Sequence, residues 1–135
     1  MVNLNEIFAI ISAHKAENTD HKNTMNHEQL GFFLSVNGLH IKEIGGCYKD
    51  IKEVSYLVTG TPHKYGWPLN SICSAMAKAY GQDSYTICDG TGQALLMAND
   101  GETVINRFTS VKKSSPTDMS YVDISGERFT LTNEE

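Results

Sequence analysis

The sequence predicts an α+β domain of the ferredoxin-like class, in which two helices pack on one face of a mainly antiparallel sheet and extra strands follow at the C-terminus. Three observations support this prediction. The chain begins with a short apolar run, it contains two segments with helical periodicity, and strand-like segments lie between and after them. The predicted order is therefore strand, helix, strand, strand, helix, strand, followed by the additional strands.

The first predicted strand covers residues 6–12, and its centre, residues 7–11, is apolar and rich in β-branched side chains. A continuous apolar run of this length is typical of a strand that is buried on both faces in the middle of a sheet. Residues 13–25 follow with many polar side chains and with neither helical nor strand periodicity, so we expect a long loop there. Loops of this length are often functional.

The first predicted helix begins at Asn26, whose side chain can cap the N-terminus, and carries Glu28 in its first turn. Gly38 ends this helix, and its apolar residues recur at helical spacing, namely Leu30, Phe33 and Leu34. The second predicted helix covers residues 69–80, has an apolar stripe along one side and ends at Gly81.

An antiparallel pair of strands is predicted between the helices, at residues 39–48 and 54–59, because apolar and polar residues alternate in both segments. Residues 49–52 would connect the two strands, and Glu53 would open the second. Further strands are predicted after the second helix, at residues 84–88, 94–98, 104–111, 121–124 and 128–131, with a polar loop at 112–118.

The composition indicates one soluble domain that spans residues 1–135 and is large enough to bury a hydrophobic core. The net charge of -5, without a cluster of Lys or Arg, argues against nucleic acid as a partner. No apolar run is long enough for a membrane span and the N-terminus does not resemble a signal peptide, so we expect a cytoplasmic protein without a membrane partner. The cysteines are widely spaced and odd in number, which indicates reduced, partly buried thiols at Cys47, Cys73 and Cys88.

The predicted fold also suggests an assembly. A sheet with helices on only one face leaves its other face uncovered, and in small proteins another subunit often covers such a face. A homo-oligomer is therefore a reasonable hypothesis.

The segment from Gly45 to Glu53 is the most promising site, because it joins two predicted strands and brings the phenol of Tyr48 near the carboxylate of Glu53. Gly45 and Gly46 allow main-chain groups to approach a ligand closely. Spacing alone leaves two interpretations open. Tyr48 and Glu53 either serve one site, or they are a half-exposed strand tyrosine and a solvated carboxylate.

Other chemistry-bearing residues give weaker signals. His14, His21 and His27 lie in one region, but their spacing matches no metal-ligand signature, so no metal site is predicted. Residues 89–93 contain two glycines but lack the Lys-Ser/Thr ending of a phosphate loop, which favours a hairpin turn. Nothing in the sequence supplies a base beside Cys73 or Cys88, which favours packing over nucleophilic catalysis at both.

Three features together resemble a known family: Ser12-Ala13-His14 at the end of the first strand, Gly46-Cys47-Tyr48-Lys49-Asp50, and a Glu that opens the next strand. The family is that of the phage-encoded S-adenosylmethionine lyases, formerly called S-adenosylmethionine hydrolases. The resemblance extends to residue 111 and is firmest around the first strand and the Gly-Cys-Tyr motif. The connection between Tyr and Glu is several residues shorter here than in the family, so Glu53 is assigned by its position before Val54.

The resemblance implies that the protein cleaves S-adenosylmethionine to methylthioadenosine and homoserine lactone without a cofactor, by attack of the substrate's own carboxylate. Glu53 and Tyr48 would be the catalytic residues, and Glu53 would hold the substrate ammonium. The implied substrate-binding residues are Ser12, Ala13, His14, Gly45 and Gly46. The resemblance further implies a homotrimer of PII-like architecture with active sites between subunits, and an anti-restriction role in the cytoplasm of a phage-infected host.

Two other functions are compatible with the sequence. One is a non-catalytic PII-like trimer that binds an adenine nucleotide or S-adenosylmethionine, and the other is a structural or partner-binding protein. Formation of methylthioadenosine from S-adenosylmethionine would distinguish the enzyme from both. Binding without turnover would indicate the first alternative.

Overall fold

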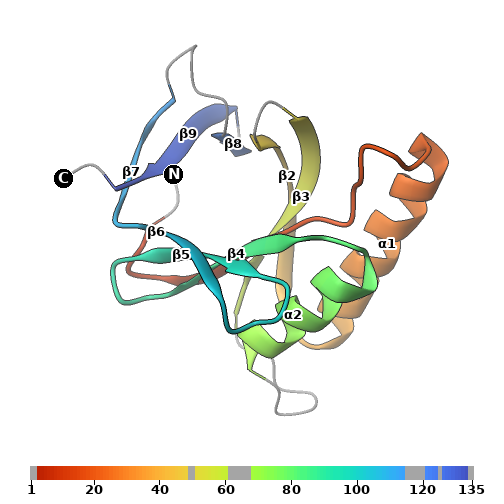
Figure 1. The fold of residues 1–135 in the computed structure, drawn as a ribbon, viewed down its shortest axis with the longest axis horizontal. Coiled ribbons are helices and arrows are strands. Elements are labelled where there is room, and N and C mark those ends of the chain that lie inside the picture. Colours follow the sequence, from red (N-terminus) through yellow and green to blue (C-terminus); the bar gives the residue numbers. More distant parts are fainter. Residues whose placement is uncertain (1–2, 49–50, 61–67, 115–120, 125, 134–135) are drawn as a thin grey trace.

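The strands and helices of the protein follow the predicted order, strand, helix, strand, strand, helix, strand and then further strands (Figure 1). The computed structural model describes residues 3–48, 51–60, 68–114, 121–124 and 126–133. Within these residues the helices are α1 (Asp20–Val36) and α2 (Leu69–Ala79), and neither is both long and apolar enough to cross a lipid bilayer. The strands are β1 (Ile7–Ile11), β2 (His40–Tyr48), β3 (Ile51–Thr59), β4 (Ser84–Asp89), β5 (Ala94–Ala98), β6 (Val104–Phe108), β7 (Ser110–Lys113), β8 (Tyr121–Ile124) and β9 (Glu127–Thr132).

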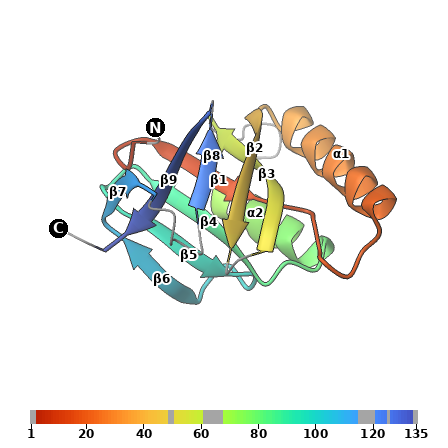
Figure 2. The ribbon, with the colours of Figure 1, turned by 90° about the horizontal axis from the view of Figure 1, so that it is seen from above.

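The predicted ferredoxin-like class is wrong, because the sheet does not remain an open layer with two helices on one face. The described strands form one sheet in the order β6-β5-β4-β1-β3-β2-β8-β9-β7, and this sheet curls into a nearly closed barrel (Figures 1 and 2). The two edge strands of the sheet, β6 and β7, are joined through Thr109, whose N–H extends the β7–β9 ladder by donating to the carbonyl of Thr132 at 3.0 Å. Twist accumulates from strand to strand, so a sheet this wide curls.

Different parts of the chain cover the two faces of β1. Ala9 and Ile11 face a core that includes apolar side chains of both helices, among them Leu30, Leu34, Ile72 and Ala77. Phe8 and Ile10 point the other way, into the barrel, where they meet Cys88, Ala94, Phe108, Val111 and Leu131. The prediction that this strand is central and buried on both faces is confirmed, since β1 also pairs with β3 on one side and β4 on the other.

The barrel covers the sheet face that the predicted fold left open. Residues of the late strands β8 and β9 close the interior, where Ile124 and Phe129 pack against Ile44 of β2. The chain therefore buries this face with its own C-terminal strands. The argument from an uncovered sheet face to a second subunit no longer holds.

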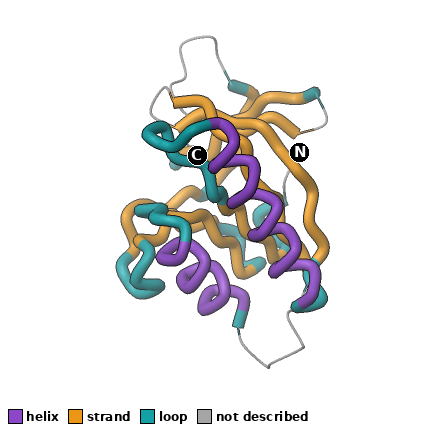
Figure 3. Tube along the Cα trace, turned by 90° about the vertical axis from the view of Figure 1, so that its right-hand side faces the viewer, coloured by secondary structure: helices purple, strands orange, loops and turns teal. Residues whose placement is uncertain are grey.

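Helix α1 begins at Asp20 and not at Asn26, so the loop predicted for residues 13–25 is wrong in its second half. Thr19 is the N-cap, and its hydroxyl oxygen accepts a hydrogen bond from the N–H of Lys22 at 3.1 Å. The first turns of α1 carry polar side chains on nearly all sides, which conceals the apolar period that identifies a helix in sequence. Figure 3 shows both helices lying against the strands.

β2 and β3 form the predicted antiparallel hairpin, in which Gly46 pairs with Glu53. β3 already begins at Ile51, so the predicted connection at 49–52 was too long, and residues 49 and 50 lie outside the described residues. The other edge of β2 pairs with β8, and a Cβ atom on Gly46 would lie 3.0 Å from the carbonyl oxygen of Tyr121. The small size of Gly46 therefore allows β8 to approach.

The C-terminal strands differ from the prediction in one place. The strand predicted at residues 104–111 is divided into β6 and β7 around Thr109, and β7 continues into the segment predicted as a polar loop, of which residues 115–118 lie outside the described residues. The predicted closing hairpin is confirmed as β8 and β9. The predicted end of the second helix is also confirmed, since Gly81 follows α2 with a φ of 67°.

Candidate functional site

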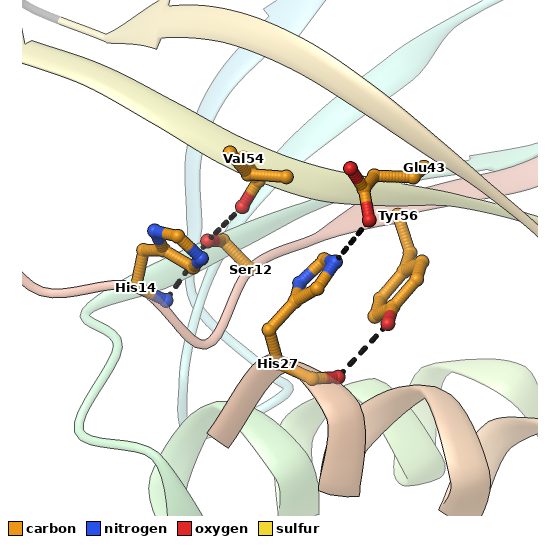
Figure 4. Close-up of polar contacts among 6 residues, drawn as sticks. All are labelled: Ser12, His14, His27, Glu43, Val54 and Tyr56. Carbon is orange, nitrogen blue, oxygen red and sulfur yellow. Dashed lines mark hydrogen bonds and ion pairs between the residues drawn. The ribbon is translucent and has the colours of Figure 1, made fainter. Parts of the chain in front are cut away.

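The predicted substrate-binding segment, Ser12 to His14, follows β1 directly and is tied to β3. The hydroxyl of Ser12 donates to the carbonyl of Val54 at 2.7 Å and accepts a hydrogen bond from the N–H of His14 at 3.1 Å (Figure 4). Val54 follows Glu53 in the chain, so this bond joins the segment to the strand that carries the predicted carboxylate.

Both helices help to hold the same segment. Gln82, just after α2, donates a hydrogen bond from its amide nitrogen to the carbonyl of His14 at 2.7 Å. Asn23 of α1 bonds both main-chain groups of Lys15, accepting from its N–H at 2.9 Å and donating to its carbonyl at 3.0 Å. The main chain that leaves β1 is therefore fixed before any ligand binds, which is the requirement for recognition by backbone groups.

Glu53 lies in β3 on the face of the sheet that is turned toward the barrel. Strand side chains alternate between faces, and Leu57, four positions further along β3, packs in the barrel interior. Glu53 is half-buried, and this burial raises the pKa of its carboxyl. Among the described residues no side chain forms an ion pair with it. The arrangement suits a ligand that brings a positive charge.

The structure brings part of the predicted site together. Gly46 lies opposite Glu53 and Gly45 lies opposite Val54, which accepts the bond from Ser12. Ala13 is completely buried, so its side chain serves packing. The backbone position of Tyr48 pairs with that of Ile51 at the end of the hairpin, and the side chain of Tyr48 lies outside the part of the chain that the structure describes. The assignment of these residues to substrate stays a prediction.

His14 takes part in a cluster that the sequence did not reveal. We call the side chains of His14, His27, Glu43 and Tyr56 the histidine cluster. The ring of His27 is stacked on that of Tyr56, with centroids 4.0 Å apart and an interplanar angle of 4°, and the ring of His14 meets it edge-on at 5.4 Å. Nε2 of His27 lies 2.9 Å from a carboxylate oxygen of Glu43. Figure 4 shows His27 between His14 and Tyr56.

His27 is almost completely buried, and its bonding determines its tautomer. A carboxylate oxygen only accepts, so Nε2 of His27 carries the hydrogen that is shared with Glu43. Nδ1 of His27 is buried and has no hydrogen-bond partner among the described residues. The hydroxyl of Tyr56 donates to the main-chain carbonyl of His27 at 2.9 Å, which attaches helix α1 to β3 at this point.

Gly31 is the one signal in the sequence that could have indicated this contact. A glycine inside a helix weakens it and usually has a packing reason. Here a Cβ atom on Gly31 would lie 2.5 Å from the hydroxyl oxygen of Tyr56. The partners themselves come from α1, β2 and β3, so their meeting depends on the tertiary structure.

The electrostatics of the cluster keep His14 neutral near pH 7. Burial lowers the pKa of the His14 imidazole, and the neighbouring His27 lowers it further, while Glu43 and Asp20 act in the opposite direction. A neutral ring can pack against a flat or cationic ligand group without charge repulsion. Among the described residues, no group of three or more His, Cys, Asp or Glu side chains is placed to hold a metal ion.

Comparison with models of protein families identifies the family of this chain. A search of curated proteins found no match. The model of the S-Adenosylmethionine lyase family matches residues 9–132, a span that includes the segment after β1, the β2–β3 hairpin and the histidine cluster. Because this match covers nearly the whole sequence, the chain belongs to the S-adenosylmethionine lyase family.

Proposed function

We propose that the protein cleaves S-adenosylmethionine to methylthioadenosine and homoserine lactone. Membership of the S-adenosylmethionine lyase family supports this substrate. The observation that carries the site assignment is Glu53, a half-buried carboxyl with a raised pKa that forms no ion pair among the described residues. The substrate ammonium would supply the missing positive charge.

The reaction needs a folded substrate more than it needs a protein base. The substrate carboxylate attacks its own γ-carbon, a carbon–oxygen bond forms, and the carbon–sulfur bond breaks with its electron pair passing to sulfur. The sulfonium leaves as a neutral thioether, and no proton moves in this step. Confinement of the flexible methionine arm in a reactive geometry can supply much of the rate acceleration. The opposite charges of carboxylate and sulfonium neutralise each other in the transition state, so a dry site favours the step.

The protein's part is to bind and orient. Glu53 holds the substrate ammonium by a charge-assisted hydrogen bond, which lowers the pKa of its carboxyl on binding. Tyr48 orients the same end of the substrate. Main-chain groups of Ser12, Ala13, Gly45 and Gly46 contact the adenosine or the carboxylate, and the ring of His14 packs against the substrate. The fixed main chain after β1 supports this assignment.

We further propose that the site is completed by neighbouring copies in a homotrimer. The two helices cover one face of the central strands and the barrel interior encloses the other, so we look for the interface on another surface. The outer side of α1 supports one, because Met25, Phe32 and Val36 are exposed there and Phe32 is 72% exposed. Light scattering that gives the mass of a monomer at micromolar concentration would contradict the trimer. In a host cell, the same reaction would remove the methyl donor on which methyltransferases and some restriction systems depend.

The function is tested by incubating the purified protein with S-adenosylmethionine in ¹⁸O-labelled water and separating the products. We expect methylthioadenosine together with homoserine lactone, and homoserine only later, as the lactone opens. An ¹⁸O label in the hydroxyl group of homoserine would show attack by water and overturn the intramolecular mechanism. Binding of S-adenosylmethionine without methylthioadenosine would overturn the enzymatic function and indicate a binding protein.

A further inference from the structure

The histidine cluster adjoins the fixed segment after β1 and has no role in the mechanism above. Its central ring, His27, is 9% exposed at the side chain, whereas its ion-pair partner Glu43 is 67% exposed. An isolated surface ion pair contributes little to stability, so the pair alone does not account for a buried histidine with an unbonded Nδ1. The arrangement of the rings offers a better reason.

We propose that His27 is a positioning residue of the substrate site, which fixes the ring of His14 and acts through that ring without touching the substrate. This inference rests on the proposed function, because that function assigns the segment Ser12 to His14 to substrate binding. It names a residue outside that segment on which the geometry of the site depends.

Three contacts restrain His27. Tyr56 stacks on one face of its ring and bonds its main-chain carbonyl, and Glu43 bonds its Nε2. The ring therefore has little freedom to rotate or to slide. His14 meets this ring edge-on, while its own main chain is held by Ser12 and Gln82. With both its main chain and its ring restrained, His14 presents one orientation to a ligand.

The charged groups around His14 come from several elements. His27 and Asp20 of α1 and Glu43 of β2 act on the His14 imidazole. Lys15, the next residue in the chain, is paired with Glu17 at 2.9 Å. Loss of the His27 ring would reduce the burial of His14 and remove the neighbouring imidazole. Both changes raise the pKa of His14 toward its usual value of 6.5.

A double-mutant cycle tests whether His27 acts through His14. We expect His27→Ala to reduce kcat/KM about tenfold, mainly through KM, and to have less than about a twofold effect in a His14→Ala background. His27→Phe keeps a flat ring between Tyr56 and His14 and is expected to recover most of the loss. His21→Gln, at an exposed histidine of the same helix, serves as the control and should leave kcat/KM unchanged.

An equal loss of kcat/KM on His27→Ala in the wild-type and His14→Ala backgrounds would overturn the proposal, because it would show a general structural role for His27. A second measurement does not depend on turnover. We expect NMR titration of the His14 ring to give a higher pKa in His27→Phe than in the wild type, and a higher one still in His27→Ala, and an unchanged titration would overturn the proposal. If the wild type does not cleave S-adenosylmethionine, the proposed function fails, and this titration still decides the role of His27.

Discussion

Glu43 and Glu53 lie on the same β-hairpin but on opposite faces of the sheet, and their surroundings differ. Glu43 is largely exposed and is held by a buried histidine, His27. Glu53 is half-buried, its pKa is raised by burial, and no described side chain forms an ion pair with it. A buried charge without a partner costs stability, and such a cost is typical of functional sites. The difference indicates that Glu43 helps to hold the histidine cluster in place and that Glu53 is available to bind a ligand.

The largest expected effect comes from Glu53→Gln, which removes the charge but keeps the shape. Loss of a buried charge pair with the substrate ammonium should weaken binding of S-adenosylmethionine on the order of 100-fold. The same change should raise Tm at pH 7, because an uncompensated carboxylate is no longer buried. Calorimetric titration and thermal unfolding measure the two effects. Weaker binding with a lowered Tm would indicate a structural role for Glu53 instead.

A smaller effect is expected from Gly31→Ala, which disturbs the contact between helix α1 and Tyr56 of the histidine cluster. In an exposed helix position this change would stabilise by about 1 kcal/mol. Here the new methyl group would collide with the hydroxyl of Tyr56, so we expect destabilisation of about 1–3 kcal/mol in urea unfolding. Ser35→Ala, on the exposed side of the same helix, is the control. A stabilised Gly31→Ala protein would show that the contact between Gly31 and Tyr56 is not close.

The smallest expected effect is in the pH dependence of stability, where the two regions act with opposite sign. The folded pKa of His14 lies below 6.5, so the unfolded chain binds the proton first and stability falls as the pH drops below 6.5. The folded pKa of Glu53 lies above 4.5, so the folded state binds the proton first and stability rises as the pH falls through that folded value. As the pH falls from 7 to about 4.5, His14→Gln should therefore lose less stability than the wild type, and Glu53→Gln more.

Thermal unfolding of these proteins across that pH range provides the measurement. His21→Gln, at an exposed histidine of the same helix, serves as the control for the loss of an imidazole. Identical profiles for the wild type and His14→Gln would contradict the lowered pKa of His14. Identical profiles for the wild type and Glu53→Gln would contradict the buried state of Glu53.

The sequence predicted the individual strands and helices better than it predicted the closure of the sheet into a barrel. The strand at Ile7–Ile11 was predicted because its apolar run is continuous, and the structure explains that run by two different cores on its two faces. The barrel was missed because alternation in β8 and β9 says which residues are buried, but not which sheet face they cover. Curling depends on the order of strands across the whole sheet, which no local pattern contains.

In the candidate site, too, contacts between neighbouring segments of the chain could be predicted and contacts between distant segments could not. The hairpin that sets Gly46 opposite Glu53 could be predicted, since its strands are neighbours in sequence. The meeting of His27 with Glu43 and Tyr56 could not, because it joins a helix to two strands that lie 16 and 29 positions further along the chain. Gly46 was expected to let the main chain approach a ligand, and in the structure it makes room for Tyr121 of β8.

The most direct test of the account compares the initial rate of methylthioadenosine formation in the wild type, Glu53→Gln and Asp50→Asn at saturating S-adenosylmethionine. We predict turnover in the wild type and in Asp50→Asn, and loss of most turnover in Glu53→Gln, which should remain folded and keep the oligomeric state of the wild type. Wild-type turnover in Glu53→Gln, or loss of turnover in Asp50→Asn alone, would contradict the account.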